Sequence, residues 1–95
     1  MVSDETLIFK PIKTNEDKID AMVMHVVSTM NEMGYDGADQ VAGYLLCGDP
    51  TYITSKNGCR VGIGKLDRFT MLEHIMKKYV DTVTKENTIN KMEEN

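Results

Sequence analysis

The side chains most able to do chemistry in this chain of 95 residues are two histidines and two cysteines. His25 or His74 could polarise a nucleophile, but no serine or cysteine stands at a telling spacing from either. Cys47 and Cys59 are twelve residues apart, without a CxxC pair or a histidine at zinc-ligand spacing. This pattern favours two small reduced thiols over a redox pair or half a metal site. We therefore expect no enzymatic activity, no metal and no cofactor.

A glycine-rich run, GCRVGIGK at residues 58–65, is the segment most similar to a phosphate-binding loop. A Walker A loop needs its first glycine at position 59, which is Cys59, and a serine or threonine after the lysine, where Leu66 stands. A dinucleotide-binding fingerprint needs a third glycine at position 67, which is Asp67. The run therefore predicts no nucleotide site.

Charge is distributed unevenly along the chain, whose formal net charge is −4. Residues 1–55 hold three Lys/Arg against nine Asp/Glu, whereas residues 56–78 hold six against two. Such a basic block can bind an acidic protein surface, a phosphate or nucleic acid, or it can be the solvated face of a helix. The acidic remainder would repel a duplex, and the block lacks interleaved aromatic residues for stacking on single strands. Nucleic acid is thus an unlikely partner, and a small helical nucleic-acid-binding module using residues 56–78 is kept as the alternative.

Apolar periodicity predicts the helices that position these residues. The first covers about residues 15–33, with Thr14 and Asp17 as a capping box and Gly34 just after its end. The second lies between Asp36 and Gly48, and the turn that follows leaves Tyr52 and Ile53 extended and buried. The third covers residues 59–67, although three glycines disfavour it, and the fourth starts at a cap on Asp67 or Thr70. Its predicted apolar face consists of Met71, Leu72, Ile75, Met76, Tyr79, Val80 and Val83.

The expected fold is all-α: a compact bundle of about four to five short helices. It divides into a flexible N-terminal arm (1–14), a helical domain (15–84) and a frayed polar tail (85–95). A chain this short buries only about 60–65% of its unfolded surface, so a second copy of itself is a plausible source of stability. The methionines of the two apolar stripes are either plain core or a self-association face. No run reaches the roughly 18 apolar residues of a membrane span, and no signal peptide is visible, so we expect a cytoplasmic protein.

One stretch is distinctive enough to indicate a family. The run QVAGYLLCGDPTYI at residues 40–53 fits the pattern QxxGYLLxGDPxYI and resembles the IreB/ReoM family of small regulators from Firmicutes. The similarity extends without a gap from about Thr6 to Val83. Further matching positions are Gly34, Tyr35, Arg60, Ile63, Lys65, Leu66, Asp67, Arg68 and Tyr79.

The resemblance implies a compact helical homodimer without catalytic activity. It also implies that the chain is a substrate of a membrane Ser/Thr protein kinase of the PASTA type. In the members that it resembles, the kinase phosphorylates an N-terminal threonine in the context D-[EQ]-T-hydrophobic. Asp4-Glu5-Thr6-Leu7 matches that context, and Ser3 stands where some members carry a second acceptor. Downstream, the resemblance implies an influence on cell-wall precursor supply and cephalosporin tolerance, through a cell-wall precursor enzyme or the Clp protease machinery.

The chain departs from the family pattern at three places. The family's Asn-Pro-[IV]-Asn after Gly-Tyr is DGAD at residues 36–39, and the other two departures fall in and near the basic block. The family's Pro-Arg-His after Tyr-Ile is TSK at residues 54–56, and its helix reading ARNLIRK is CRVGIGK at residues 59–65. Two family arginines are lost and two glycines gained, while Arg60, Lys65 and Arg68 remain as the expected partner-binding residues. We expect such a face to bind the family's partners more weakly, or to bind different ones.

Overall fold

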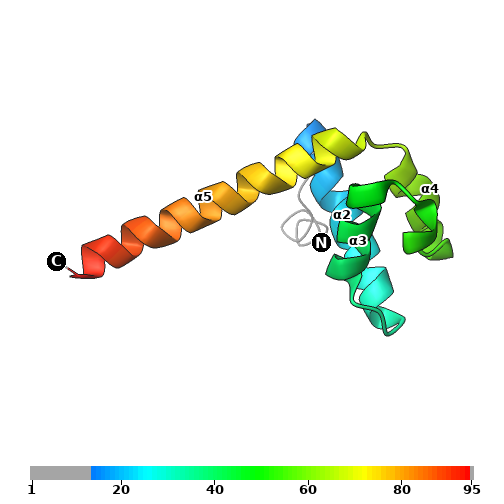
Figure 1. The fold of residues 1–95 in the computed structure, drawn as a ribbon, viewed down its shortest axis with the longest axis horizontal. Helices are drawn as coiled ribbons and strands as arrows, with labels where there is room; N and C mark the ends of the chain where they lie inside the picture. The colour runs from blue at the N-terminus through cyan, green and yellow to red at the C-terminus, as the bar shows by residue number, and fades with distance from the viewer. Residues whose placement is uncertain (1–13, 95) are drawn as a thin grey trace, which may run out of the picture.

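The computed structural model describes residues 14–94, with side chains as far as residue 87 (Figure 1). Four α-helices follow one another along the chain: α2 (Asn15–Glu32), α3 (Gly37–Cys47), α4 (Cys59–Gly64) and α5 (Arg68–Glu94). Two 3-10 turns, η1 (Pro50–Tyr52) and η2 (Lys56–Gly58), join α3 to α4. The described residues contain no strand, so the predicted all-α class is confirmed for them. The predicted arm, with Ser3 and Thr6, lies outside the described residues but for Thr14.

Helix α2 begins and ends where its sequence signals indicate. The Thr14 hydroxyl accepts from the Asp17 backbone N–H at 3.0 Å, and the Asp17 carboxylate accepts from the Thr14 N–H at 3.3 Å. This reciprocal capping box satisfies two of the donors that a helix N-terminus leaves unpaired. Met33 caps the other end, and Gly34 follows at φ +94°, a conformation that glycine adopts without strain.

Helix α3 packs closely against α2 because it starts on a glycine. Asp36 caps it by accepting from the Asp39 N–H at 3.1 Å, and the Gly37 N–H donates to the Asn31 side chain at 2.7 Å. A β-carbon on Gly37 would stand 2.5 Å from the carbonyl oxygen of Val27 on α2. Only a residue without a side chain therefore fits this crossing.

The link from α3 to α4 is tighter than the predicted extended segment. Asp49 caps η1 through the Thr51 N–H at 3.0 Å, and Ile53 alone is extended and fully buried. Tyr52 is 38% exposed, so its predicted burial is wrong. Its ring lies against Gly43, where there is no side chain to displace it, and this contact holds the tyrosine at the surface of α3.

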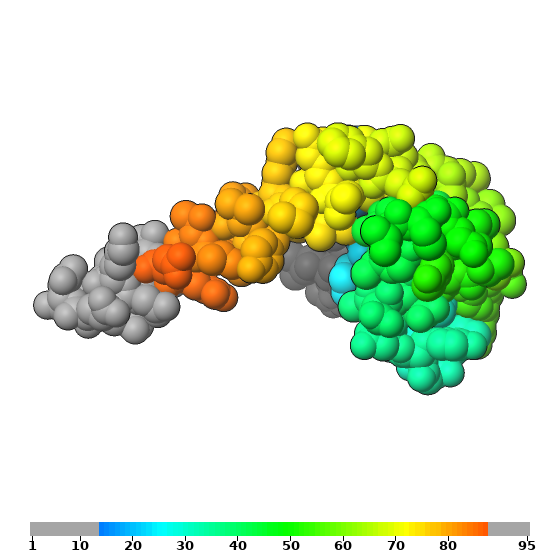
Figure 2. All heavy atoms as spheres, in the orientation of Figure 1, coloured from blue at the N-terminus to red at the C-terminus, as the bar shows by residue number. Residues whose placement is uncertain are grey.

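Helices α2, α3, α4 and the start of α5 enclose one core (Figure 1). Figure 2 shows the rounded body that they form and α5 projecting from it. Its buried members are Ile19, Val26, Met30, Val41, Tyr44, Ile53, Cys59, Ile63 and Met71. Both cysteines are free thiols, and the interpretation of Cys59 as a small core residue is confirmed, whereas Cys47 is exposed. Two stripe methionines, Met30 and Met71, are core, but Met33 and Met76 are 39% and 50% exposed.

The ends of α4 and α5 differ from the predicted boundaries. Helix α4 stops at Gly64 with Lys65 as its C-cap, three residues before the predicted end. Asp67 then caps α5, its carboxylate accepting from the Thr70 N–H at 2.9 Å. The backbone of residues 85–94, expected as a frayed tail, continues α5 as helix, and no glycine or proline interrupts this stretch. The later half of α5 extends away from the body of the molecule (Figure 1).

Candidate functional site

Of the predicted partner-binding residues, Arg60 has a structural partner within the chain. It stands in the first turn of α4, and its Nε donates to the carbonyl oxygen of Ile53 at 2.9 Å. Ile53 is fully buried, so this bond satisfies a carbonyl that water does not easily reach. The bond holds the loop before α4 in place, and it also sets the direction of the guanidinium group. The rest of the side chain is exposed.

Arg68 is held in a similar way at the start of α5. Its Nη1 donates to the carbonyl oxygen of Leu45 at 3.1 Å, in the last turn of α3, where the helix dipole favours a cation. The guanidinium lies over Gly48, the left-handed C-cap of α3 at φ +75°, and a β-carbon there would stand 2.6 Å from Arg68 Cζ. Gly48 thus both ends α3 and makes room for Arg68.

Lys65 differs from the two arginines in having no bonding partner among the described residues. It is exposed at the C-terminal end of α4, and its side chain makes no hydrogen bond or ion pair with the part of the chain that the structure describes. The three predicted residues therefore come from one continuous stretch, α4 and the start of α5. Arg60 is hydrogen-bonded to the loop before α4, and Arg68 is hydrogen-bonded to the end of α3. Lys65 lies in the turn between them.

A cluster that joins α2 to α5 was missed by the sequence reasoning. Asp20 Oδ1 lies 2.8 Å from His74 Nε2, and Asp20 Oδ2 lies 3.0 Å from Lys78 Nζ. Burial tends to raise the pKa of Asp20, but the hydrogen bonds with His74 and Lys78 and the positive charge of Lys78 outweigh it and lower that pKa. Nothing local could reveal the cluster, because Asp20 and His74 are 54 residues apart.

His25, the other histidine, contacts a backbone carbonyl instead of a side chain. Its Nε2 lies 2.9 Å from the carbonyl oxygen of Asn57 in η2, a residue at φ +56°. The contact ties α2 to the turn before α4. Within residues 14–87 no group of three or more His, Cys, Asp or Glu side chains could hold a metal ion.

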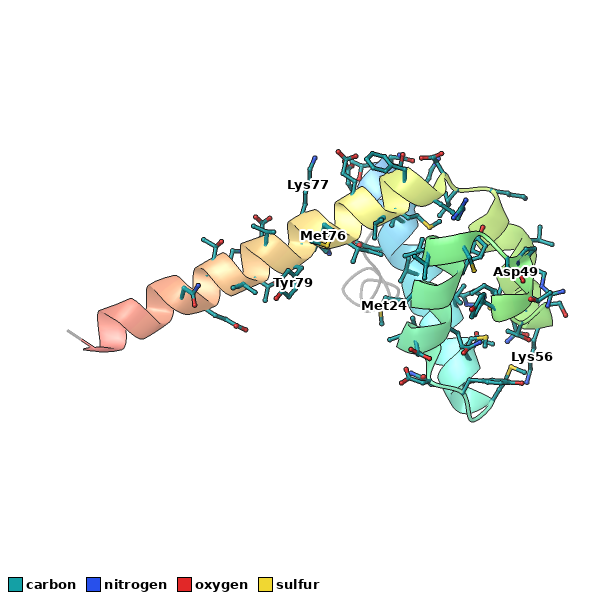
Figure 3. All side chains as sticks on the ribbon, in the orientation of Figure 1. Met24, Asp49, Lys56, Met76, Lys77 and Tyr79 are labelled. Atoms are coloured by element: carbon teal, nitrogen blue, oxygen red, sulfur yellow. The ribbon has the colours of Figure 1, made fainter. Side chains whose placement is uncertain are left out.

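The apolar face predicted for the last helix is buried only where it meets the body. Met71 is fully buried, but Met76, Tyr79 and Val80 are 50%, 63% and 52% exposed. Tyr79 and Val80 follow Met76 by three and four positions, so both lie on its side of α5. Met76 and Tyr79 point to the same side of the helix (Figure 3), and Lys77 flanks the stripe beside Met76 and Val80. The predicted apolar face is thus core at Met71 and exposed in the single chain from Met76 to Val80, because α5 leaves the body after its first turns.

A second apolar feature is a groove of about 600 Å³ between α2, α3 and α5. Val23 and Val27 of α2 line one wall, Leu45 and Leu46 of α3 another, and Leu72 and Ile75 of α5 the third. Leu46 is 86% exposed and Leu72 is 42% exposed. No charged side chain among the described residues lines the groove, so it fits apolar side chains.

Comparison with known protein families agrees with the resemblance. A family described as IreB regulatory phosphoprotein matches residues 4–81 of the chain. The matched range includes Thr6, Arg60, Lys65 and Arg68, and it begins after Ser3. None of the described helices is long and apolar enough to pass through a membrane.

Proposed function

Because this chain belongs to the IreB family of regulatory phosphoproteins, we propose that it is a non-enzymatic switch protein phosphorylated on its N-terminal arm by a PASTA-type Ser/Thr kinase. It acts in the cytoplasm through protein–protein contacts on cell-wall precursor synthesis and cephalosporin tolerance. Its targets are a cell-wall precursor enzyme or the Clp protease machinery. The family match over residues 4–81 is the observation that carries the proposal.

The proposed acceptor is Thr6, with Ser3 as a second one. Thr6 lies in the sequence Asp4-Glu5-Thr6-Leu7 and inside the matched range, whereas Ser3 precedes that range. A phosphate adds about −1.5 to −2 charges and three strong hydrogen-bond acceptors, so it changes the partners that this end of the chain can bind.

The proposed partner-binding surface consists of Arg60, Lys65 and Arg68. Arg60 and Arg68 each donate one N–H to a backbone carbonyl of their own chain. An arginine has five N–H donors, so each guanidinium retains others for a carboxylate or phosphate of a partner. The internal bonds hold both side chains in place and reduce the entropy lost when a partner binds.

The proposed assembly is a homodimer formed through the exposed apolar stripe of α5. Met76, Tyr79 and Val80 form this stripe, and each is at least half exposed in the single chain. Pairing with a second copy would remove this apolar surface from water.

Kinase labelling followed by intact-mass analysis tests the acceptor assignment. The wild-type chain, Thr6→Ala, Ser3→Ala and the double variant are incubated with a PASTA-type kinase. We expect Thr6→Ala to lose most of the phosphate and the double variant to lose all of it. Equal phosphate uptake by all four proteins would defeat the assignment.

A pull-down from the native cytosol tests the partner surface. Wild-type chain, Thr6→Ala and Thr6→Glu are compared, each with and without Lys65→Glu. We expect captured proteins that differ between Thr6→Ala and Thr6→Glu and that are lost with Lys65→Glu. Capture of DNA or RNA that falls steeply with salt would instead favour the nucleic-acid alternative.

A further inference from the structure

The groove between α2, α3 and α5 is open and apolar, and a segment of the same chain has the matching composition. Residues 1–13 lie outside the described structure, and they include Leu7, Ile8, Phe9 and Ile12. We infer that the segment Leu7–Ile12 docks in this groove and covers it within its own chain.

The attachment point of the segment favours this groove. The segment precedes Thr14, the N-cap of α2, and α2 itself forms one wall of the groove through Val23 and Val27. Asp20, between Thr14 and Val23, is bonded to His74 and Lys78 of α5, so this end of α2 lies against the helix that forms another wall. The segment therefore leaves the body at one end of the groove.

The available length fits a segment that turns back along α2. An extended chain spans about 3.3 Å per residue, so Phe9 lies up to about 17 Å from Thr14 and Leu7 up to about 23 Å. Helix α2 rises about 1.5 Å per residue, which places Val23 about 14 Å and Val27 about 20 Å from Thr14. Phe9 can thus come level with Val23, and Leu7 level with Val27.

The covalent connection of the segment to α2 favours it over a second copy of the chain as the occupant of the groove. A segment joined by a short linker has an effective concentration on the order of millimolar at its site, which a separate molecule rarely reaches. The described lining of the groove holds no charged side chain, so Leu7, Ile8 and Phe9 meet only apolar side chains there. The stripe of Met76, Tyr79 and Val80 is left for contacts between copies.

Docking would place Thr6 directly beside the edge of the groove, and in this respect the inference extends the proposed function. A phosphate on Thr6 would then stand next to a bound apolar segment. The docking itself is a property of the unphosphorylated chain. Its test therefore does not depend on whether Thr6 is an acceptor.

A spin label next to the segment tests the inference in the full chain by methyl NMR. The label is attached to Lys10→Cys in a Cys47→Ser background, where the introduced hydroxyl can still donate to the Gly43 carbonyl that Cys47 contacts at 3.1 Å. Cys59 is fully buried and protected from labelling. We expect loss of the methyl signals of Val23, Leu45 and Ile75, but not of Val61, which is 67% exposed on α4.

Three further samples make the result decisive. Leu7→Glu/Phe9→Glu should restore the groove signals, whereas Val2→Glu/Ser3→Glu, with the same added charge outside the segment, should leave them broadened. A mixture of spin-labelled and isotope-labelled chains should show no broadening. Broadening in the mixture would mean that a second copy supplies the segment, and intact groove signals in the first sample would mean that it does not dock; either result overturns the inference.

Discussion

At the scale of single residues, two glycines of this chain have opposite roles. Gly37 lies where α3 crosses α2, and a β-carbon there would meet the Val27 backbone at 2.5 and 2.8 Å. Gly64 closes α4, and nothing lies within 4 Å of the position its β-carbon would take. The first glycine is required by packing, and the second is tolerated in spite of its low helix propensity.

A pair of alanine substitutions tests this difference. Gly37→Ala should lower the free energy of unfolding by about 1–3 kcal/mol, because the Val27 backbone must move. Gly64→Ala should raise it by about 0.5–1 kcal/mol, because alanine loses less backbone entropy in a helix. Urea unfolding monitored by circular dichroism measures both. Changes of the same sign and size in the two variants would contradict this account.

Arg60 and Lys65 are both exposed and basic, yet only Arg60 bonds to a buried part of the chain. Arg60→Ala should lower the free energy of unfolding by about 1–3 kcal/mol, because the Ile53 carbonyl loses its partner. Lys65→Ala, the matched control at the end of the same helix, should change it by less than about 0.5 kcal/mol. If chemical denaturation finds the two variants equally stable, the Arg60 bond is not part of what stabilises the fold.

At the scale of elements, the contact between α2 and α5 depends on a carboxylate whose pKa is lowered. The Asp20 side chain is 38% exposed and the His74 side chain 13% exposed, so the pair lies at the edge of the core. A carboxylate with a lowered pKa binds its proton more weakly in the folded chain than in the unfolded chain. It therefore stabilises the fold above the usual aspartate pKa of 3.8, and this contribution disappears as the pH falls through the lower, folded value.

Thermal unfolding across pH tests this contact. Wild type should melt at a higher temperature than Asp20→Asn near neutral pH, and the difference should shrink as the pH falls below 3.8. Asp81→Asn, which removes an exposed carboxylate of α5 instead, should follow wild type throughout. A difference between wild type and Asp20→Asn that stays constant with pH would show that ionisation of Asp20 does not contribute.

At the scale of the whole molecule, α5 belongs to the core in its first turns and extends away from the body in its later half. Its first turns bury Met71 and hold Arg68 against α3, whereas Tyr79 and Val80 are more than half exposed. A helix with an apolar side of this kind is typical of a contact between chains. The proposed homodimer follows from this division of α5.

Sedimentation analysis tests the homodimer. Wild type should sediment as a dimer, and Met76→Glu/Tyr79→Glu as a monomer, because pairing would bury two charges without partners. Lys85→Glu, nine positions after Met76 and therefore on the opposite side of α5, should remain dimeric. A monomeric wild type, or a dimer in all three proteins, would exclude the α5 stripe as the interface.

Local interactions explain which features the sequence alone could determine. The capping box of Thr14 and Asp17, the cap at Asp36 and the left-handed Gly48 each act within a few residues, so their spacing predicts them. The all-α class and the family follow from periodicity and from the run at residues 40–53.

Only the tertiary structure decided the rest, because it depends on contacts between distant residues. The pairing of Asp20 with His74, the bond of Arg68 to Leu45 and the ring of Tyr52 over Gly43 have no local signal. The exposure of the α5 stripe is of the same kind. An apolar helical face has the same periodicity whether its neighbour is its own chain or another molecule, and only the path of α5 away from the body distinguishes the two.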